Sequence, residues 1–196
     1  MTRLSWRSTV AALSVAALAF VPVLGHAQAA KSVKIRVQSV IPPSADEVTM
    51  LKEFAADVAA LTNNTVTFEI LPAGAVVAVN DTLDAVDKGL IEGGFAWTHY
   101  WSGKHPAATL FGSPAAGGGV GMDNFAWVSW FLYGGGQALY DELWKEMKVN
   151  VKGFMLQPVG PEALGWFKEQ ITDAGQMSGL KYRTVGLAAD VLLEMG

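Results

Sequence analysis

The chain of 196 residues contains no cysteine, and only 16% of its residues are charged. Without cysteine it can form no disulfide framework, and it has no thiol to carry a lipid anchor. The formal net charge of −4 disfavours nucleic acid and anionic membrane surfaces as main partners. Hydrophobic residues nevertheless make up 51% of the chain, which is enough apolar surface for a packed core.

A long hydrophobic run of membrane-spanning length is also lacking. The apolar stretch 9–24 falls short of the roughly 20 residues that a spanning helix needs. It follows Arg3 and Arg7 and precedes Ala27-Gln28-Ala29, a small-residue pattern typical of signal-peptidase cleavage. We therefore expect 1–29 to be a cleaved signal peptide, with an uncleaved anchor as the alternative. Cleavage removes two positive charges and no negative one, so the net charge becomes −6.

Residues for nucleophilic, zinc or nucleotide chemistry are scarce in the mature chain. Its histidines are His99 and His105, too few for a typical zinc site. Ser113 lacks the glycine spacing of a nucleophile elbow, and 117–121 lacks the G-x-G-x-x-G pattern of a dinucleotide site. The missing cysteines favour a freely diffusing bacterial periplasmic protein.

Alternating strands and helices are the clearest pattern present. Val33, Ile35 and Val37 alternate with polar residues, which indicates a strand. Ser44-Ala45-Asp46-Glu47 then matches a capping box before a run of helical spacing. The expected order is strand 33–37, helix 48–61, strand 66–70, helix 83–90 capped by Asp81 or Thr82, strand 95–97, helix 136–148, strand 149–156, strand 180–185 and a helix from 187. The pattern predicts an α/β fold with a mostly parallel sheet.

Three loops should gather at the carboxyl ends of the first strands, where ligands bind in such sheets. They are 40–44, 72–79 and 98–105, and the last is rich in hydrogen-bonding side chains. The aromatic stretch 122–133 is interpreted either as a short buried helix or as an aromatic cleft wall.

Two later residues are candidates for binding a polar ligand. Gln157 can donate and accept hydrogen bonds without needing a charge partner, although it could equally cap the turn before Pro158. The Arg183 guanidinium matches a carboxylate bidentately, and a helix start close behind it also favours an anion. A surface salt bridge remains the alternative for Arg183.

Several of these segments resemble the solute-binding proteins of TRAP transporters. The similar segments are the export signal, Lys34-Ile35-Arg36-Val37, Leu71-Pro72-Ala73-Gly74 and Gly179-Leu180-Lys181-Tyr182-Arg183. The segments around Tyr100, Phe111-Gly112-Ser113-Pro114 and Gln157-Pro158 are similar to the branch that binds 2-oxo acids and related monocarboxylates.

The resemblance implies a periplasmic two-lobed clamshell that delivers a small organic acid, such as pyruvate, to a membrane permease. It assigns 30–150 to the first lobe and 151–196 to a crossing strand and an incomplete second lobe. It places Arg183 on the ligand carboxylate, Gln157 on the neighbouring oxygen and Tyr100, more loosely, as an aromatic contact. No cofactor is required, although Na⁺ or Ca²⁺ beside the ligand and a homodimer are left open.

Members of that family continue well past the point where this sequence stops. We therefore expect a chain of this length to expose apolar residues of the second lobe and to be unable to close around a ligand. Two rival functions are kept: a secreted α/β enzyme acting on an organic acid with His99 as base, and a sugar-binding protein that uses the aromatic residues.

Overall fold

The computed structural model describes residues 31–112, 122–158, 165–184 and 187–195. Within this part, the strands are β1 (Val33–Ser39), β2 (Val66–Leu71) and β3 (Gly93–Phe95). They pair in parallel in the order β2-β1-β3. The predicted α/β class with a parallel sheet is confirmed.

The helices of the described residues follow the strands in the expected alternation. They are α1 (Asp46–Leu61), α2 (Thr82–Asp87), α3 (Asn124–Tyr133), α4 (Gly136–Glu146) and α5 (Leu187–Glu194). Short 3-10 turns occur at Val79–Asp81, Thr98–Trp101, Pro106–Phe111 and Ala174–Met177.

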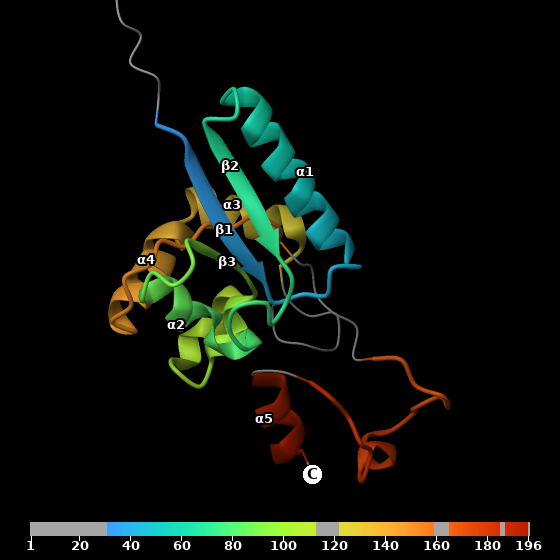
Figure 1. Cartoon of the computed structure of the whole chain (residues 1–196). Coiled ribbons are helices and arrows are strands. Elements are labelled where there is room, and N and C mark those ends of the chain that lie inside the picture. Colours follow the sequence, from blue (N-terminus) through green and yellow to red (C-terminus); the bar gives the residue numbers. More distant parts are fainter. Residues whose placement is uncertain (1–30, 113–121, 159–164, 185–186, 196) are drawn as a thin grey trace, which may run out of the picture. The chain divides into compact units, whose positions relative to one another are not determined.

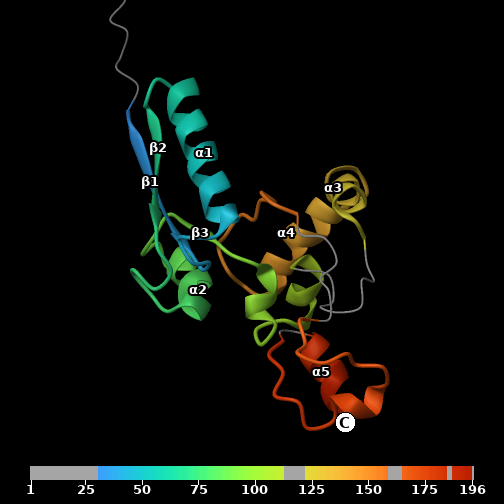
Figure 2. The same cartoon turned by 90° about the vertical axis from the view of Figure 1, so that its right-hand side faces the viewer.

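The β1-α1-β2 unit forms as its periodicity predicts. α1 runs along β1 and β2 and lies on one face of the sheet (Figures 1 and 2). Its buried residues Val48 and Leu51 have helical spacing, and the Phe54 ring packs against Phe68 of β2 with 5.7 Å between centroids. Burial of each large apolar side chain contributes about 1.5–3 kcal/mol, so this face holds the helix on the sheet.

One fully buried amide fixes the loop that follows β2. Gln38 of β1 is 0% exposed, and its Oε1 accepts hydrogen bonds from the backbone N–H groups of Val76 at 2.8 Å and Val77 at 3.2 Å. Its Nε2 donates to the Val77 carbonyl at 3.0 Å and to Thr82 Oγ1 at 3.2 Å. Gln38 thereby ties this loop to the central strand of the sheet.

An ion pair connects β1 with the approach to β3. The Arg36 guanidinium donates from Nε to Glu92 Oε2 at 2.8 Å and from an Nη to Oε1 at 2.8 Å. The Glu92 carboxylate also accepts the Arg36 backbone N–H at 2.9 Å. These hydrogen bonds lower the pKa of Glu92 from its ordinary 4.5 to about 2.

The predicted side-chain caps of α1 and α2 are wrong. Ala45 is the N-cap of α1, because its N–H bonds to the Pro42 carbonyl at 3.0 Å and the turn places Ser44 one residue too early. Asp81 precedes α2 but makes no side-chain cap, and the Thr82 hydroxyl donates to the Val79 carbonyl instead. Acidic residues in the first turn still favour the start of α1 through the helix dipole.

One residue of the apolar face that the spacing in α4 predicts is exposed. Leu139, Leu143 and Met147 are spaced to share this face; Leu143 is buried and Met147 packs against the core cluster, but Leu139 is 50% exposed. Tyr140 and Trp144, four residues apart, pack against the core in its place. The large rings bury more apolar area than leucine, so they rotate the helix towards their own side.

Two predicted strand segments are not strands, and a third begins and ends two residues earlier than predicted. Residues 149–156 form no sheet pairing, because their backbone lies against the side chains of α4 rather than beside a strand. Residues 180–184 are also irregular, and Val185 lies outside the described residues. β3 ends at Phe95, so Ala96 and Trp97 are not part of it.

Other predictions fall outside the described residues, namely the signal peptide 1–29, Ser113 and the glycines of 117–121. The lobe boundary after 150 stays a prediction. The expected exposure of apolar side chains beyond it is confirmed, since Phe154 is 71% exposed, Trp166 100% and Leu193 79%.

Candidate functional site

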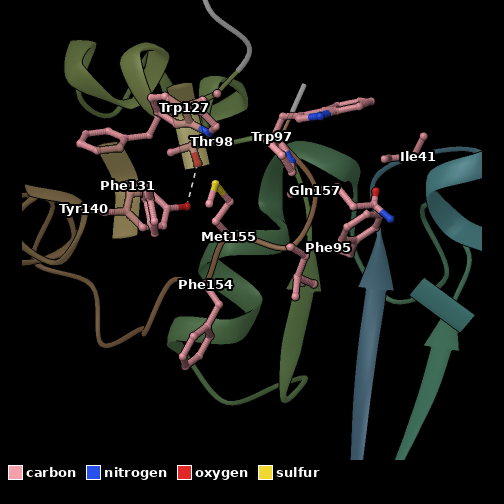
Figure 3. A pocket seen from close by; sticks show the side chains of 16 residues that line it. Ile41, Phe95, Trp97, Thr98, Trp127, Phe131, Tyr140, Phe154, Met155 and Gln157 are labelled. Carbon is pink, nitrogen blue, oxygen red and sulfur yellow. Dashed lines mark hydrogen bonds between the residues drawn. The ribbon is translucent and has the colours of Figure 1, made fainter. Parts of the chain in front are cut away.

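A cavity of about 100 Å³ lies beyond the carboxyl ends of β1 and β3. Ile41 follows β1, and the segment Phe95–Thr98 leads out of β3. α3, α4 and the segment 154–158 complete the wall (Figure 3). Two of the three predicted loops contribute lining residues, whereas 72–79 contributes none.

The segment 149–158 reaches the cavity because α2 and α4 hold it. The Asn150 backbone N–H donates to Asp87 Oδ1 at 2.7 Å, and Lys152 Nζ bonds both oxygens of Asp141 at 2.5 and 2.6 Å. The Lys152 hydrogen bonds lower the pKa of Asp141. At Gly153 the backbone lies so close to α4 that an added Cβ would come within 2.5 Å of Trp144 Nε1 and nearer still to the Tyr140 ring. Only glycine fits there.

Gln157, predicted as a ligand contact, lines this cavity. Its Nε2 donates to the Glu47 backbone carbonyl in the first turn of α1 at 3.0 Å. Its Oε1 is buried and has no hydrogen-bond partner among the described residues. The backbone bond therefore fixes the amide and leaves one strong acceptor free, which is unusual for a buried polar atom. The alternative of a local turn cap is not what the structure shows.

A hydroxyl pair lines another part of the cavity. Thr98 Oγ1 and Tyr140 Oη lie 2.8 Å apart, and Thr98 is only 3% exposed. Burial raises the pKa of Tyr140, and the Thr98 hydrogen bond opposes that shift. Tyr140 is therefore a neutral phenol at physiological pH.

The aromatic stretch supplies a wall of the cavity. Trp127 and Phe131 of α3 line it, with 6.1 Å between their ring centroids. Phe131 also packs edge-on to Tyr140 at 5.6 Å. The same helix leaves Phe125 and Tyr133 almost fully exposed. The cleft-wall interpretation therefore fits this helix better than that of a buried helix.

The other predicted site residues lie apart from this wall. Tyr100 does not line the cavity, and its ring stacks on the lining residue Trp97 with 6.1 Å between centroids. Arg183 is exposed, is absent from the cavity lining and makes no ion pair with another described residue. The structure thus brings Gln157 to the cavity and places Tyr100 one ring behind it, but it does not bring Arg183 there.

Neither histidine lines the cavity, and each contacts a neighbouring turn or glycine. His105 Nδ1 accepts the Ala107 backbone N–H at 3.2 Å and so caps a 3-10 turn. His99 is 8% exposed, is absent from the cavity lining and packs so tightly on Gly112 that no Cβ would fit at 112. Neither position supports the enzyme alternative, in which His99 acts as base on a bound acid.

The described residues offer neither a metal cluster nor a membrane-spanning helix. No three side chains of the His, Cys, Asp and Glu types cluster there closely enough to hold a metal ion. No helix among the described residues has the length and apolar character needed to cross a bilayer.

Residues 37–196 match the bacterial extracellular solute-binding protein family 7. The chain belongs to this family. Among its relatives is the monocarboxylate 2-oxoacid-binding periplasmic protein of Nostoc sp., which is 30% identical over 167 residues. The match covers 84% of this chain and 44% of the relative.

Solved structures of family members share the fold. A TRAP transporter solute-binding protein from Bordetella bronchiseptica, with copurified calcium and picolinate, has a TM-score of 0.74 at 27% identity. That match covers 85% of this chain and 48% of the other. A protein from Colwellia psychrerythraea with bound calcium and pyruvate has a TM-score of 0.68 at 24% identity, covering 85% and 49%. The chain thus spans about half the length of these relatives, and its α/β architecture is that of TRAP periplasmic binding proteins.

Sequence reasoning missed two contributors to the cavity. Tyr140 was not predicted, because the apolar face of its helix was assigned from Leu139, Leu143 and Met147. Its spacing of four residues from Trp144 places both rings on one face and could have indicated its burial. Phe154–Leu156 were assigned to a strand, and only their packing on α4 shows that they form a wall.

Proposed function

We propose that the protein is the extracytoplasmic solute-binding component of a TRAP-type secondary transporter. It captures a small monocarboxylate, such as the 2-oxo acid pyruvate, in the periplasm and delivers it to the membrane permease. It performs no chemical step. Family membership supports the class of function, and the names of the Nostoc and Bordetella relatives support a small organic acid as ligand.

The position of Gln157 supports the proposal on this chain's own residues. Gln157 sits in the cavity wall with a fixed amide and an unpaired Oε1. This oxygen only accepts hydrogen bonds and a 2-oxo acid anion has none to donate, so it contacts the ligand through a bound cation or a bridging water. Arg183, free of other ion pairs among the described residues, binds the carboxylate in this proposal. Tyr100 supports the site through Trp97.

A cation beside the ligand fits the same amide only in part. Oxygen ligands suit Na⁺ and Ca²⁺, and Gln157 Oε1 is an unpaired oxygen of this kind. The described residues supply no acidic cluster to complete a cation site around it. We therefore propose that Gln157 Oε1 is one ligand of a cation that binds together with the acid, and we propose no resident cofactor.

The test is a calorimetric titration of pyruvate into the protein expressed from its full reading frame without residues 1–29. We expect one site, at least tenfold weaker in Arg183→Ala because a lost charged hydrogen bond costs about 1.5–3 kcal/mol. Lys181→Ala, which removes an exposed positive charge two residues away, is the matched control and should bind normally.

Gln157→Leu should also weaken binding. It removes an unpaired buried oxygen but also the Nε2 hydrogen bond to the Glu47 carbonyl, so we expect a stability loss no larger than the roughly 0.5–1.5 kcal/mol of one hydrogen bond. If no small acid binds and a sugar does, the aromatic wall is a sugar site and the proposal is wrong. Conversion of pyruvate during the titration would support the enzyme alternative.

A further inference from the structure

The cavity wall carries no charge. None of its lining residues is Asp, Glu, Lys, Arg or His, and apart from two tryptophan indoles its polar side chains are Thr98, Tyr140 and Gln157. Figure 3 draws Gln157 and Ile41 towards one end and the Thr98–Tyr140 pair towards the other, with Met155 between them. A ligand held at Gln157 therefore has a second polar contact available at its far end.

The hydroxyl pair contains one hydrogen more than its own bond uses. Thr98 and Tyr140 have two hydroxyl hydrogens, and a single hydrogen bond of 2.8 Å joins them. Neither side chain has another hydrogen-bond partner among the described residues. One donor is therefore left over at a wall where Thr98 is 3% exposed, and an unused buried donor is costly.

The direction of the pair decides which hydroxyl keeps that donor. A phenol is a stronger acid than an alcohol, so it is the better hydrogen-bond donor, and the alcohol oxygen is the better acceptor. Burial keeps the Tyr140 phenol protonated. Tyr140 therefore donates to Thr98, and the Thr98 hydroxyl hydrogen is free to turn to the cavity.

We propose that the Thr98–Tyr140 pair determines specificity by donating a hydrogen bond from Thr98 to a neutral oxygen on the carbon tail of the ligand. This inference rests on the proposed function, which supplies the carboxylate end of the ligand. A second carboxylate is disfavoured, because the wall has no positive charge to compensate its desolvation. The preferred ligands are thus monocarboxylates with a keto, hydroxyl or ether oxygen beyond the 2-oxo group.

The size of the cavity agrees with such a ligand. At about 100 Å³ it is several times larger than the roughly 10–15 Å³ that admits one water molecule, so it has room for a small acid with a short tail.

The experiment compares 2-oxopentanoate with 2,4-dioxopentanoate, which has the same carbon skeleton and adds one tail oxygen. Both are titrated calorimetrically into the protein expressed from its full reading frame. Wild type should bind the dioxo acid about three- to tenfold more tightly. Thr98→Val should abolish this ratio, whatever its effect on the affinity for 2-oxopentanoate, whereas Thr98→Ser should keep the ratio. A purely structural role for Thr98 would weaken both acids equally.

Tyr140→Phe should reduce the ratio without abolishing it, since Thr98 keeps its hydrogen but loses its orienting partner. Equal affinity of wild type for the two acids, a ratio that survives Thr98→Val, or tighter binding of the dicarboxylate 2-oxoglutarate would overturn the inference. If none of these acids nor pyruvate binds, the proposed function fails and the inference fails with it. Binding of the acids without the predicted ratio overturns the inference alone.

Discussion

At the scale of single residues, the Arg36–Glu92 pair shows how a surface contact can act on protonation. Both side chains are about two-fifths exposed, yet the carboxylate accepts three hydrogen bonds from one arginine. The fixed fork of the guanidinium explains this arrangement, since lysine could not match both carboxylate oxygens.

We predict that Glu92 titrates with a pKa of about 2 and that Arg36→Gln returns it towards 4.5. Because the folded pKa is depressed, the stability that the pair contributes is present above about pH 4.5 and is lost as pH falls towards 2. Unfolding midpoints of wild type and Arg36→Gln should therefore converge over this window.

Carboxyl carbon shifts from NMR measure the titration directly. Lys34→Gln breaks a more exposed bridge to Glu69 and is the control, for which we expect little change at any pH. An ordinary Glu92 pKa in wild type would show that the ion pair does not persist in solution.

Residue chemistry was the part of the site that sequence predicted best. Gln157 was selected as a neutral amide before a proline and lines the cavity, and Thr98 belonged to the predicted polar loop. Their partners, the Glu47 carbonyl and Tyr140, lie 110 and 42 residues away along the chain. No local pattern encodes contacts at such separations, so those partners could not be predicted.

At the scale of elements, periodicity predicted the β1-α1-β2 unit well because one face of each element is buried against the next. It failed at 149–156, where alternating valines and a glycine looked like a strand. Alternation predicts only that one side is covered. Here the cover is α4, and without a neighbouring strand the backbone cannot form a ladder.

The loop held by Gln38 gives a prediction at this scale. Gln38→Met keeps the volume but leaves two backbone N–H groups and a carbonyl of 76–77 without their partner. Each unsatisfied buried group costs about 1–3 kcal/mol, so we expect a loss of at least 2 kcal/mol in urea unfolding. Gln170→Met, at an exposed position, should change little. A loss below 0.5 kcal/mol for Gln38→Met would mean that water replaces the amide.

At the scale of the whole molecule, hydrogen bonding is unevenly distributed. The strands and long helices lie within 33–146, whereas 165–184 contains one short 3-10 turn and few backbone hydrogen bonds among the described residues. Large apolar side chains such as Trp166 are exposed in that later part.

We predict a matching pattern of amide exchange for a chain that ends at Gly196. Peptides from β1, β2 and α4 should remain protected for hours, while those from 165–184 exchange within seconds because few amides there are paired. Hydrogen–deuterium exchange with mass spectrometry measures this, and α1 provides an internal reference. Strong protection of 165–184 would contradict the prediction and show that the backbone amides of this segment are hydrogen-bonded in solution.

The close approach at Gly153 also constrains how the Tyr140 ring can move. Phe111, Phe131 and Trp144 surround the ring at centroid distances of 5.0, 5.6 and 4.9 Å, and the Gly153 backbone closes the remaining side. A half-turn of the ring about its Cβ–Cγ bond must sweep an edge through that backbone, so it requires the segment around Gly153 to lift away. The flipping rate of the Tyr140 ring therefore reports how often the cavity wall at Gly153 opens.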